Sequence, residues 1–147
     1  CSLPGVASVL AMVILAEGGD LRRFHHHRQF LKYCGLDLAK SQSGQFRGRE
    51  MLSKRGNALL RMAIWMAAQR AVRMTENSFR DKYERYMKQD PGNADVRRKA
   101  LTAVAAQMAR VAYALVKRLE PYRGYHEHAL PSGSIPLTRA VGAPATP

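Results

Sequence analysis

The stretch "SKRGNALLRMAIWMAAQRAVRM", residues 53–74, decides the fold. After its glycine, apolar residues recur at intervals of three and four, which is the spacing of one buried helix face. Asn57 stands where an N-cap is expected, because its side chain can accept a hydrogen bond from the first helical turn. We therefore predict a long helix from Asn57 to Met74. Its apolar face comprises Leu59, Leu60, Ala63, Ile64, Ala67 and Ala71.

Similar segments lie on both sides, separated by glycine and proline. We predict helices over 6–17, 27–34, 77–88 and 94–119. Glycines follow the first two and Pro121 follows the last, as is usual at helix ends. No segment shows a convincing strand period of two, so the expected fold class is all-α, a bundle of long helices. From Tyr122 onward Gly, Pro, Ser and Thr dominate, which predicts a flexible, disordered tail over 121–147.

The composition indicates one basic domain. The chain has 147 residues, 46% of them hydrophobic, with 24 Lys and Arg against 11 Asp and Glu and a net charge of +13. Such an excess favours a polyanion partner, nucleic acid before an anionic membrane surface, although an inert basic surface is the plain alternative. The apolar run over 6–16 is too short to span a bilayer, and no signal peptide is evident, so we expect a cytoplasmic protein. Two cysteines, Cys1 and Cys34, make no disulfide framework, and we expect Cys34 to be buried.

The N-terminal turn "LPGVA" leads directly into an apolar helix. A Pro-Gly-hydrophobic-small turn before a helix is typical of helix-hairpin-helix modules, in which backbone N–H groups approach a DNA phosphate. Gly5 is the residue expected nearest that phosphate. Ala7 stands where the usual pattern has a second glycine, and a turn that only packs two helices is the alternative.

The segment before the long helix is the strongest candidate for a phosphate site. Between residues 40 and 61 there are six basic residues and one acid, Glu50. They surround a helix N-terminus, where backbone N–H groups favour an anion, and Gly56 and Asn57 form the turn that faces it. The basic residues are Lys40, Arg47, Arg49, Lys54, Arg55 and Arg61.

Ser43 stands beside Gly44 in the same segment. A serine hydroxyl is a weak nucleophile until a base or a metal activates it, and no carboxylate cluster with metal-ligand spacing accompanies it. From the residues alone, a serine that caps or turns the chain is the ordinary interpretation. The three histidines at 25–27 likewise indicate a solvated helix start rather than a metal site.

Two further patterns allow two interpretations each. Phe79, Tyr83 and Tyr86 share a helix side that is more often core than a platform for stacked bases. Basic residues on the last two helices could track a nucleic-acid backbone. They are Arg80, Lys82, Arg85, Lys88, Arg97, Arg98 and Lys99.

The order of motifs resembles the C-terminal transposase domain of the insertion-sequence one-hundred-ten family, the RNA-guided bridge recombinases of bacterial mobile elements. The resemblance is close over 3–74 and weaker to 118, with aspartate at 37 and alanine at 7 as departures. The motifs are "PGVA", "EGGD" (17–20), "RRF" (22–24), "YCGL" (33–36), "SG" (43–44) and "SKRGNALLR" (53–61).

The resemblance implies a serine recombinase made of two parts. A RuvC-like domain with four acidic residues would hold Mg²⁺, and residues 1–120 would be the transposase catalytic domain. Ser43 matches the nucleophile by position, with Ser41 as the alternative two residues away. Arg47, Lys54, Arg55 and Arg61 would then bind or polarise the phosphate.

The resemblance also implies the partners: DNA, a noncoding guide RNA and further copies of the protein, in the bacterial cytoplasm at the nucleoid. The first residue is Cys, and no RuvC-like segment or metal site is found, so we expect this chain to be a piece of a longer protein that binds no cofactor itself. Without its metal-bearing half, the fragment is expected to be inactive. A noncatalytic basic helical module that binds nucleic acid is the second hypothesis, and an amphipathic membrane-surface protein is a poor third.

Overall fold

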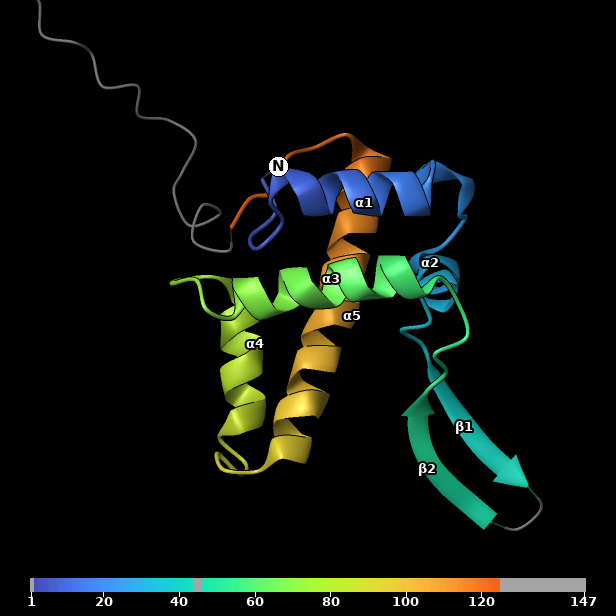
Figure 1. The fold of residues 1–147 in the computed structure, drawn as a ribbon, viewed down its shortest axis with the longest axis vertical. Helices are drawn as coiled ribbons and strands as arrows, with labels where there is room; N and C mark the ends of the chain where they lie inside the picture. The colour runs from blue at the N-terminus through green and yellow to red at the C-terminus, as the bar shows by residue number, and fades with distance from the viewer. Residues whose placement is uncertain (1, 44–45, 125–147) are drawn as a thin grey trace, which may run out of the picture.

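The computed structural model describes residues 2–43 and 46–124, and for 39–51 it describes the backbone alone. Five α-helices, one 3-10 turn and one β-hairpin make up the described part (Figure 1). In chain order they are α1 (Ser8–Gly18), η1 (Leu21–Arg23), α2 (His27–Cys34), β1 (Leu38–Ser43), β2 (Phe46–Leu52), α3 (Ala58–Ala71), α4 (Ser78–Met87) and α5 (Ala94–Arg118).

The predicted helices are confirmed, with their ends shifted by a few residues at most. The α2 bounds agree with the prediction, and α3 ends at Ala71 rather than Met74. Asn57 is the N-cap of α3, because its Oδ1 accepts a hydrogen bond of 3.0 Å from the Leu60 N–H. One position of the predicted apolar face differs: Leu59 is 53% exposed.

The longest helix, α5, lies at the centre of the fold. It packs against α2, α3 and α4, and α1 lies alongside α3 (Figure 1). The buried positions of α3 are four alanines together with Leu60 and Ile64, and the alanines let the helices approach each other closely. The core is closed by large side chains with almost no solvent exposure: Phe30, Phe79, Leu21, Leu60, Ile64 and Met108.

The predicted all-α class is confirmed for the packed body, which is helical throughout. The expectation that no strand occurs is wrong for one segment. Residues 38–52, which lie between two predicted helices, form an antiparallel two-stranded hairpin that projects from the helices (Figure 1). An alternating apolar pattern arises when one sheet face is buried. This segment has no such alternation. Its strands pair through backbone hydrogen bonds, which the pattern of apolar residues in the sequence does not indicate.

The chain after α5 returns to the body. The Tyr122 N–H donates to Ser2 Oγ at 2.7 Å, and the Tyr122 ring lies 6.0 Å from that of Phe79. The first residues of the segment expected to be a flexible tail therefore pack against α4. The rest of that prediction, from 125 to 147, falls outside the described residues.

Candidate functional site

The candidate nucleophile lies on the hairpin. Ser43 is the last residue of β1 and pairs with Phe46, next to the pair formed by Gln42 and Arg47. The backbones of Ser43 and Arg47 therefore lie close together, on the two facing strands of the hairpin. Leu38 pairs with Leu52 at the other end, where the hairpin joins the helices.

The register of the hairpin breaks next to Ser43. The shift lies between Lys40, which pairs with Glu50, and Gln42, which pairs with Arg47. Ser41 occupies the irregular position. Such bulges are common beside active sites, where they redirect the chain. The two candidate serines therefore occupy different backbone environments: Ser41 lies at the irregularity and Ser43 in a regular pair.

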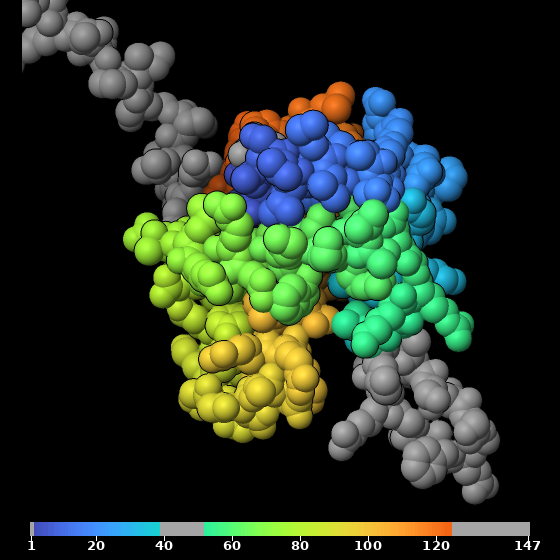
Figure 2. All heavy atoms as spheres, in the orientation of Figure 1, coloured from blue at the N-terminus to red at the C-terminus, as the bar shows by residue number. Residues whose placement is uncertain are grey.

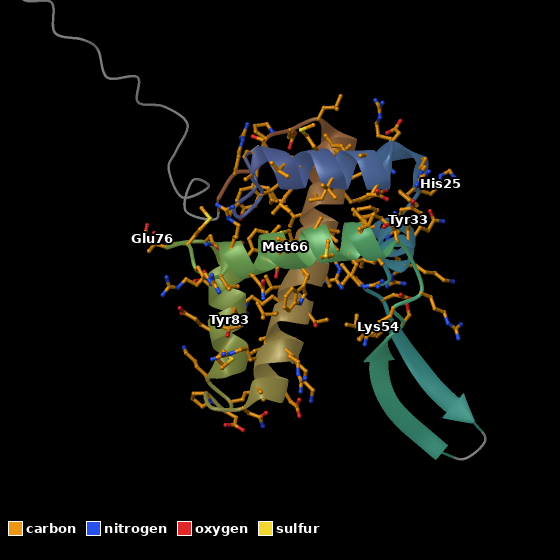
Figure 3. The ribbon with its side chains drawn as sticks, in the orientation of Figure 1. His25, Tyr33, Lys54, Met66, Glu76 and Tyr83 are labelled. Carbon is orange, nitrogen blue, oxygen red and sulfur yellow. The ribbon has the colours of Figure 1, made fainter. Side chains whose placement is uncertain are left out.

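The predicted phosphate-binding residues from Lys54 to Asn57, together with Arg61, lie at the base of the hairpin. Five residue steps separate Leu38 from Ser43, so Ser43 stands roughly 17 Å along the strand from this base. Lys54 and Arg55 follow β2 and are exposed there, and Figure 3 shows Lys54 at the point where the hairpin meets the helices. The predicted site residues therefore divide into a group at the turn end and a group at the base.

A pair of hydrogen bonds fixes the two ends of the hairpin to each other. The Ser53 N–H donates to the Asp37 carbonyl at 3.0 Å, and Ser53 Oγ donates to Asp37 Oδ1 at 2.5 Å. The chain enters and leaves the hairpin through these two residues. The direction in which the hairpin projects therefore depends on how this base is attached to α2 and α3.

Two glycines allow that attachment. Gly35 ends α2 with φ +68°, and a Cβ there would lie 2.6 Å from Arg61 Nη1. A Cβ on Gly56 would lie 2.4 Å from the Tyr33 carbonyl oxygen. The adjacent Asn57 N–H donates to that same carbonyl at 2.8 Å. Gly56 therefore packs against the end of α2, because only a residue without a side chain fits there.

Arg61 holds the same place from the α3 side. Its Nη1 donates to the Cys34 carbonyl at 3.2 Å and to the Lys54 carbonyl at 3.1 Å. One carbonyl belongs to the end of α2 and the other to the segment that leaves the hairpin. Arg61 was predicted to face a phosphate; in this structure its guanidinium connects two parts of the backbone.

Asn57 has a second partner besides the N-cap bond. Its Nδ2 donates to Glu17 Oε2 at 2.7 Å, and the Tyr33 hydroxyl donates to the Glu17 carbonyl at 3.1 Å. We call this set of residues the motif junction: Glu17, Tyr33, Gly56, Asn57 and Arg61. It joins α1, α2 and α3 at the base of the hairpin, and Figure 3 shows Tyr33 beside the first turns of α3.

Gly5 lies away from this group. It is buried with φ +80°, and a Cβ there would lie 2.2 Å from the Ala67 carbonyl oxygen and 2.8 Å from the Ala71 nitrogen. The absence of a side chain at Gly5 thus lets the N-terminal turn approach the backbone of α3. Its predicted contact with phosphate remains a prediction.

The "RRF" motif, which the residues alone left without a role, also has a packing function. The Arg23 guanidinium lies 4.8 Å from the centroid of the Phe24 ring and 5.0 Å from that of Tyr33. The Phe24 carbonyl accepts a hydrogen bond of 2.8 Å from the Tyr113 hydroxyl. This motif therefore connects the segment before α2 to the junction and to α5.

Cys34, at the end of α2 beside the junction, carries a buried thiol. Burial raises the pKa of Cys34 to about 12, and the nearby Arg61 charge opposes that shift only in part. In the described part of the chain, no three His, Cys, Asp or Glu side chains gather as metal ligands would. No helix in the described ranges is long and apolar enough to cross a membrane.

Comparison with known proteins places these motifs in a family. Residues 1–84 match the family described as "Transposase IS116/IS110/IS902 family". The chain is 33% identical over 122 residues to the transposase for insertion sequence element IS1111A of Coxiella burnetii, an alignment that covers 83% of this chain and 33% of that protein. It is 29% identical over 126 residues to a probable family 20 transposase of Pseudomonas aeruginosa, covering 83% and 36%. The chain spans about a third of the length of these relatives. It belongs to the IS116/IS110/IS902 transposase family.

Proposed function

We propose that this chain supplies the serine nucleophile of a DNA transposase, and that Ser43 is that nucleophile. Its Oγ attacks a DNA phosphorus, so a phosphoserine ester bond forms while the bond between phosphorus and the 3′ oxygen breaks. The proton lost by the serine hydroxyl is balanced by the proton gained by the leaving 3′ oxygen. The free 3′ hydroxyl and the covalent intermediate are then the reactants for strand exchange.

One observation carries the proposal: Ser43 stands at the turn end of a hairpin whose base is held by the family motifs. The motifs "EGGD", "YCGL" and "SKRGN" supply that base. A projecting hairpin can place its tip against a DNA backbone while the helices stay packed. The motif junction would set the direction of that projection.

The cations take two roles in this proposal. Arg47 pairs with Gln42, the neighbour of Ser43. From there it stabilises the charge on the phosphate that is attacked. Lys54 and Arg55 lie roughly 17 Å away at the base, which is about five nucleotides of one duplex strand. They would bind the same strand further along. Arg61, Gly56 and Asn57 act by holding the base.

The other components of the transposase are proposed from family membership. A noncoding RNA would choose the DNA by base pairing, further copies would complete the assembly, and a RuvC-like domain elsewhere in the protein would bind Mg²⁺. No step above depends on a metal held by the described residues.

The test uses the full-length protein with its RNA, Mg²⁺ and end-labelled donor DNA. Wild-type protein should form an adduct with DNA that survives denaturing electrophoresis. Ser43→Ala should abolish both the adduct and strand cleavage while DNA affinity is retained. Ser41→Ala is the matched control in the same strand. If Ser41→Ala loses the adduct and Ser43→Ala keeps it, the nucleophile is Ser41.

A noncatalytic nucleic-acid-binding module is the second candidate function. The exposed Lys54 and Arg55 at the hairpin base favour it, because they can bind backbone phosphates without any contribution from Ser43. This function predicts salt-dependent DNA binding with no covalent adduct in wild-type protein or in either serine variant.

A further inference from the structure

A broad groove opens between the hairpin base and the α4–α5 end of the molecule. It has a volume of about 840 Å³ and is lined by residues of α2, α4 and α5 together with Leu38 and Leu52 of the hairpin. Figure 2 shows a hollow in the surface. On one side of it lies the lobe formed by α4 and the start of α5, and on the other side lies the segment that connects to the hairpin. The groove is thus formed by parts of the chain that are far apart in sequence.

Cations stand on every wall of this groove. The described residues that line it include six Lys or Arg side chains and one acid, Asp37, whose Oδ1 accepts a hydrogen bond from Ser53. Two of the six lie one turn apart on α2, one on α4 and three on α5. They are Arg28, Lys32, Lys82, Arg98, Lys99 and Arg110.

The part of the groove lining that α5 supplies between its cations is made of small residues. On α5 the lining positions between Lys99 and Arg110 are Thr102, Ala103 and Ala106, which share one helix face. Cations therefore stand at both ends of a helix stripe whose middle carries little bulk. The stripe is roughly 16 Å long at 1.5 Å per residue. One strand of a DNA duplex presents about five phosphates over that length.

The cations are close enough to affect each other. The pKa of Lys82 is lowered by burial first and then by the charges of Arg110 and Arg85. Arg98 forms an ion pair with Asp95 at the outer end of the groove. A polyanion bound in the groove would reduce the repulsion between these clustered positive charges.

The groove continues toward the candidate nucleophile. A neighbouring hollow of about 330 Å³ shares Leu36, Leu52 and Thr102 with it and is also lined by Lys54 and Arg61. The basic surface therefore runs from α4 and α5 to the hairpin base, and from there the hairpin leads to Ser43.

We infer that this groove binds the phosphate backbone of duplex DNA on its way to the hairpin, as a second contact distinct from the residues around Ser43. This inference rests on the proposed function, because DNA is chosen over RNA as the strand that continues to the nucleophile. The α5 stripe holds one backbone, and the α2 cations face the same backbone from the other wall.

The test measures the salt dependence of affinity for a 20-base-pair DNA duplex, using the full-length protein. Each phosphate contact contributes about 0.9 to the slope of log affinity against log salt. Lys99→Gln with Arg110→Gln should lower the steepness of that slope by about 2 and weaken binding at least tenfold near 0.15 M salt. Both side chains are exposed on α5, so the fold should be retained.

Two further variants keep the test decisive. Arg28→Gln with Lys32→Gln, on the opposite wall, should change the slope in the same way. Arg70→Gln with Arg73→Gln removes the same charge from exposed positions outside the groove and should leave the slope nearly unchanged. Equal losses in groove and control variants would overturn the inference, because net charge alone would then explain binding. A groove-dependent slope for duplex RNA but not for duplex DNA would overturn it as well.

The outcome is separable from that of the proposed function. If the groove variants bind as the control does and Ser43-dependent adducts still form, only the groove assignment falls. If adducts never form and the groove variants lose their slope, only the serine chemistry falls.

Discussion

Asn57 Nδ2 donates a hydrogen bond of 2.7 Å to Glu17 Oε2, across 40 positions of the sequence. The bond joins the first turn of α3 to the last turn of α1, and the same asparagine caps α3 through Leu60. One side chain thus satisfies a helix terminus and holds a second helix in place. Motifs that are separate in the sequence meet here, directly beneath the hairpin.

Asn57→Ala should lower the free energy of unfolding by about 2–3 kcal/mol, since it removes an N-cap and a hydrogen bond to a charged group. Asn57→Asp should keep the cap but place a carboxylate against that of Glu17. Its cost should disappear when Glu17→Gln is added, because the glutamine amide can donate to the new aspartate. Urea unfolding of the wild type, Asn57→Asp, Glu17→Gln and the double variant measures this cycle. Equal stability of Asn57→Asp with and without Glu17→Gln would contradict the pairing.

Arg61 is expected to stabilise the hairpin base rather than to bind DNA directly. Its guanidinium spans two carbonyls, and a lysine ammonium cannot reproduce that planar geometry. Arg61→Lys should cost about 1–2 kcal/mol and speed amide hydrogen exchange at Ser53 and Asn57. Arg55→Lys, at an exposed position in the preceding loop, is the control and should change neither quantity. Unchanged exchange in Arg61→Lys would return Arg61 to the phosphate role expected from the sequence.

Local chemistry predicted the helices well. Helical spacing located α3 and α5, and the asparagine at 57 marked the start of α3 because a cap depends only on the next three residues. The hairpin was missed because its strands lack an alternating apolar pattern. The helical body was therefore predictable, whereas the element that carries Ser43 was not.

The motif junction could not be predicted for a different reason. Its bonds between helices join residues 16 to 40 positions apart, so they exist only once the helices are packed. Family resemblance showed that these residues belong together but not what each one contacts. Gly5, which has no side chain, likewise allows close approach of either a DNA phosphate or the backbone of a packed helix. The local sequence does not distinguish these two neighbours.

Gly5→Ala should be strongly destabilising. The position has φ +80°, and the new methyl group would overlap the Ala67 carbonyl. Backbone strain and the clash should together cost at least about 2 kcal/mol, seen as a lower thermal midpoint. Gly92→Ala is the matched control, since a Cβ there meets nothing within 4 Å and should leave the midpoint unchanged or slightly raised. A Gly5→Ala protein as stable as wild type but weakened in DNA binding would favour the phosphate role.

Cys34 should make stability depend on pH in the alkaline range. Burial raises the pKa of its thiol to about 12 from an ordinary value of 9.0, so the unfolded chain ionises first. The contribution of the neutral Cys34 thiol to the free energy of unfolding is therefore fully present below pH 9. It is lost as the pH rises toward 12, by at most about 1.4 kcal/mol per pH unit. Urea midpoints of a Cys1→Ser protein should fall across this window more steeply than those of Cys1→Ser with Cys34→Ala. The difference between the two should be constant below pH 8, where the thiol is neutral in both states. Parallel curves from pH 8 to pH 11 would mean that the Cys34 thiol is accessible to water in the folded protein.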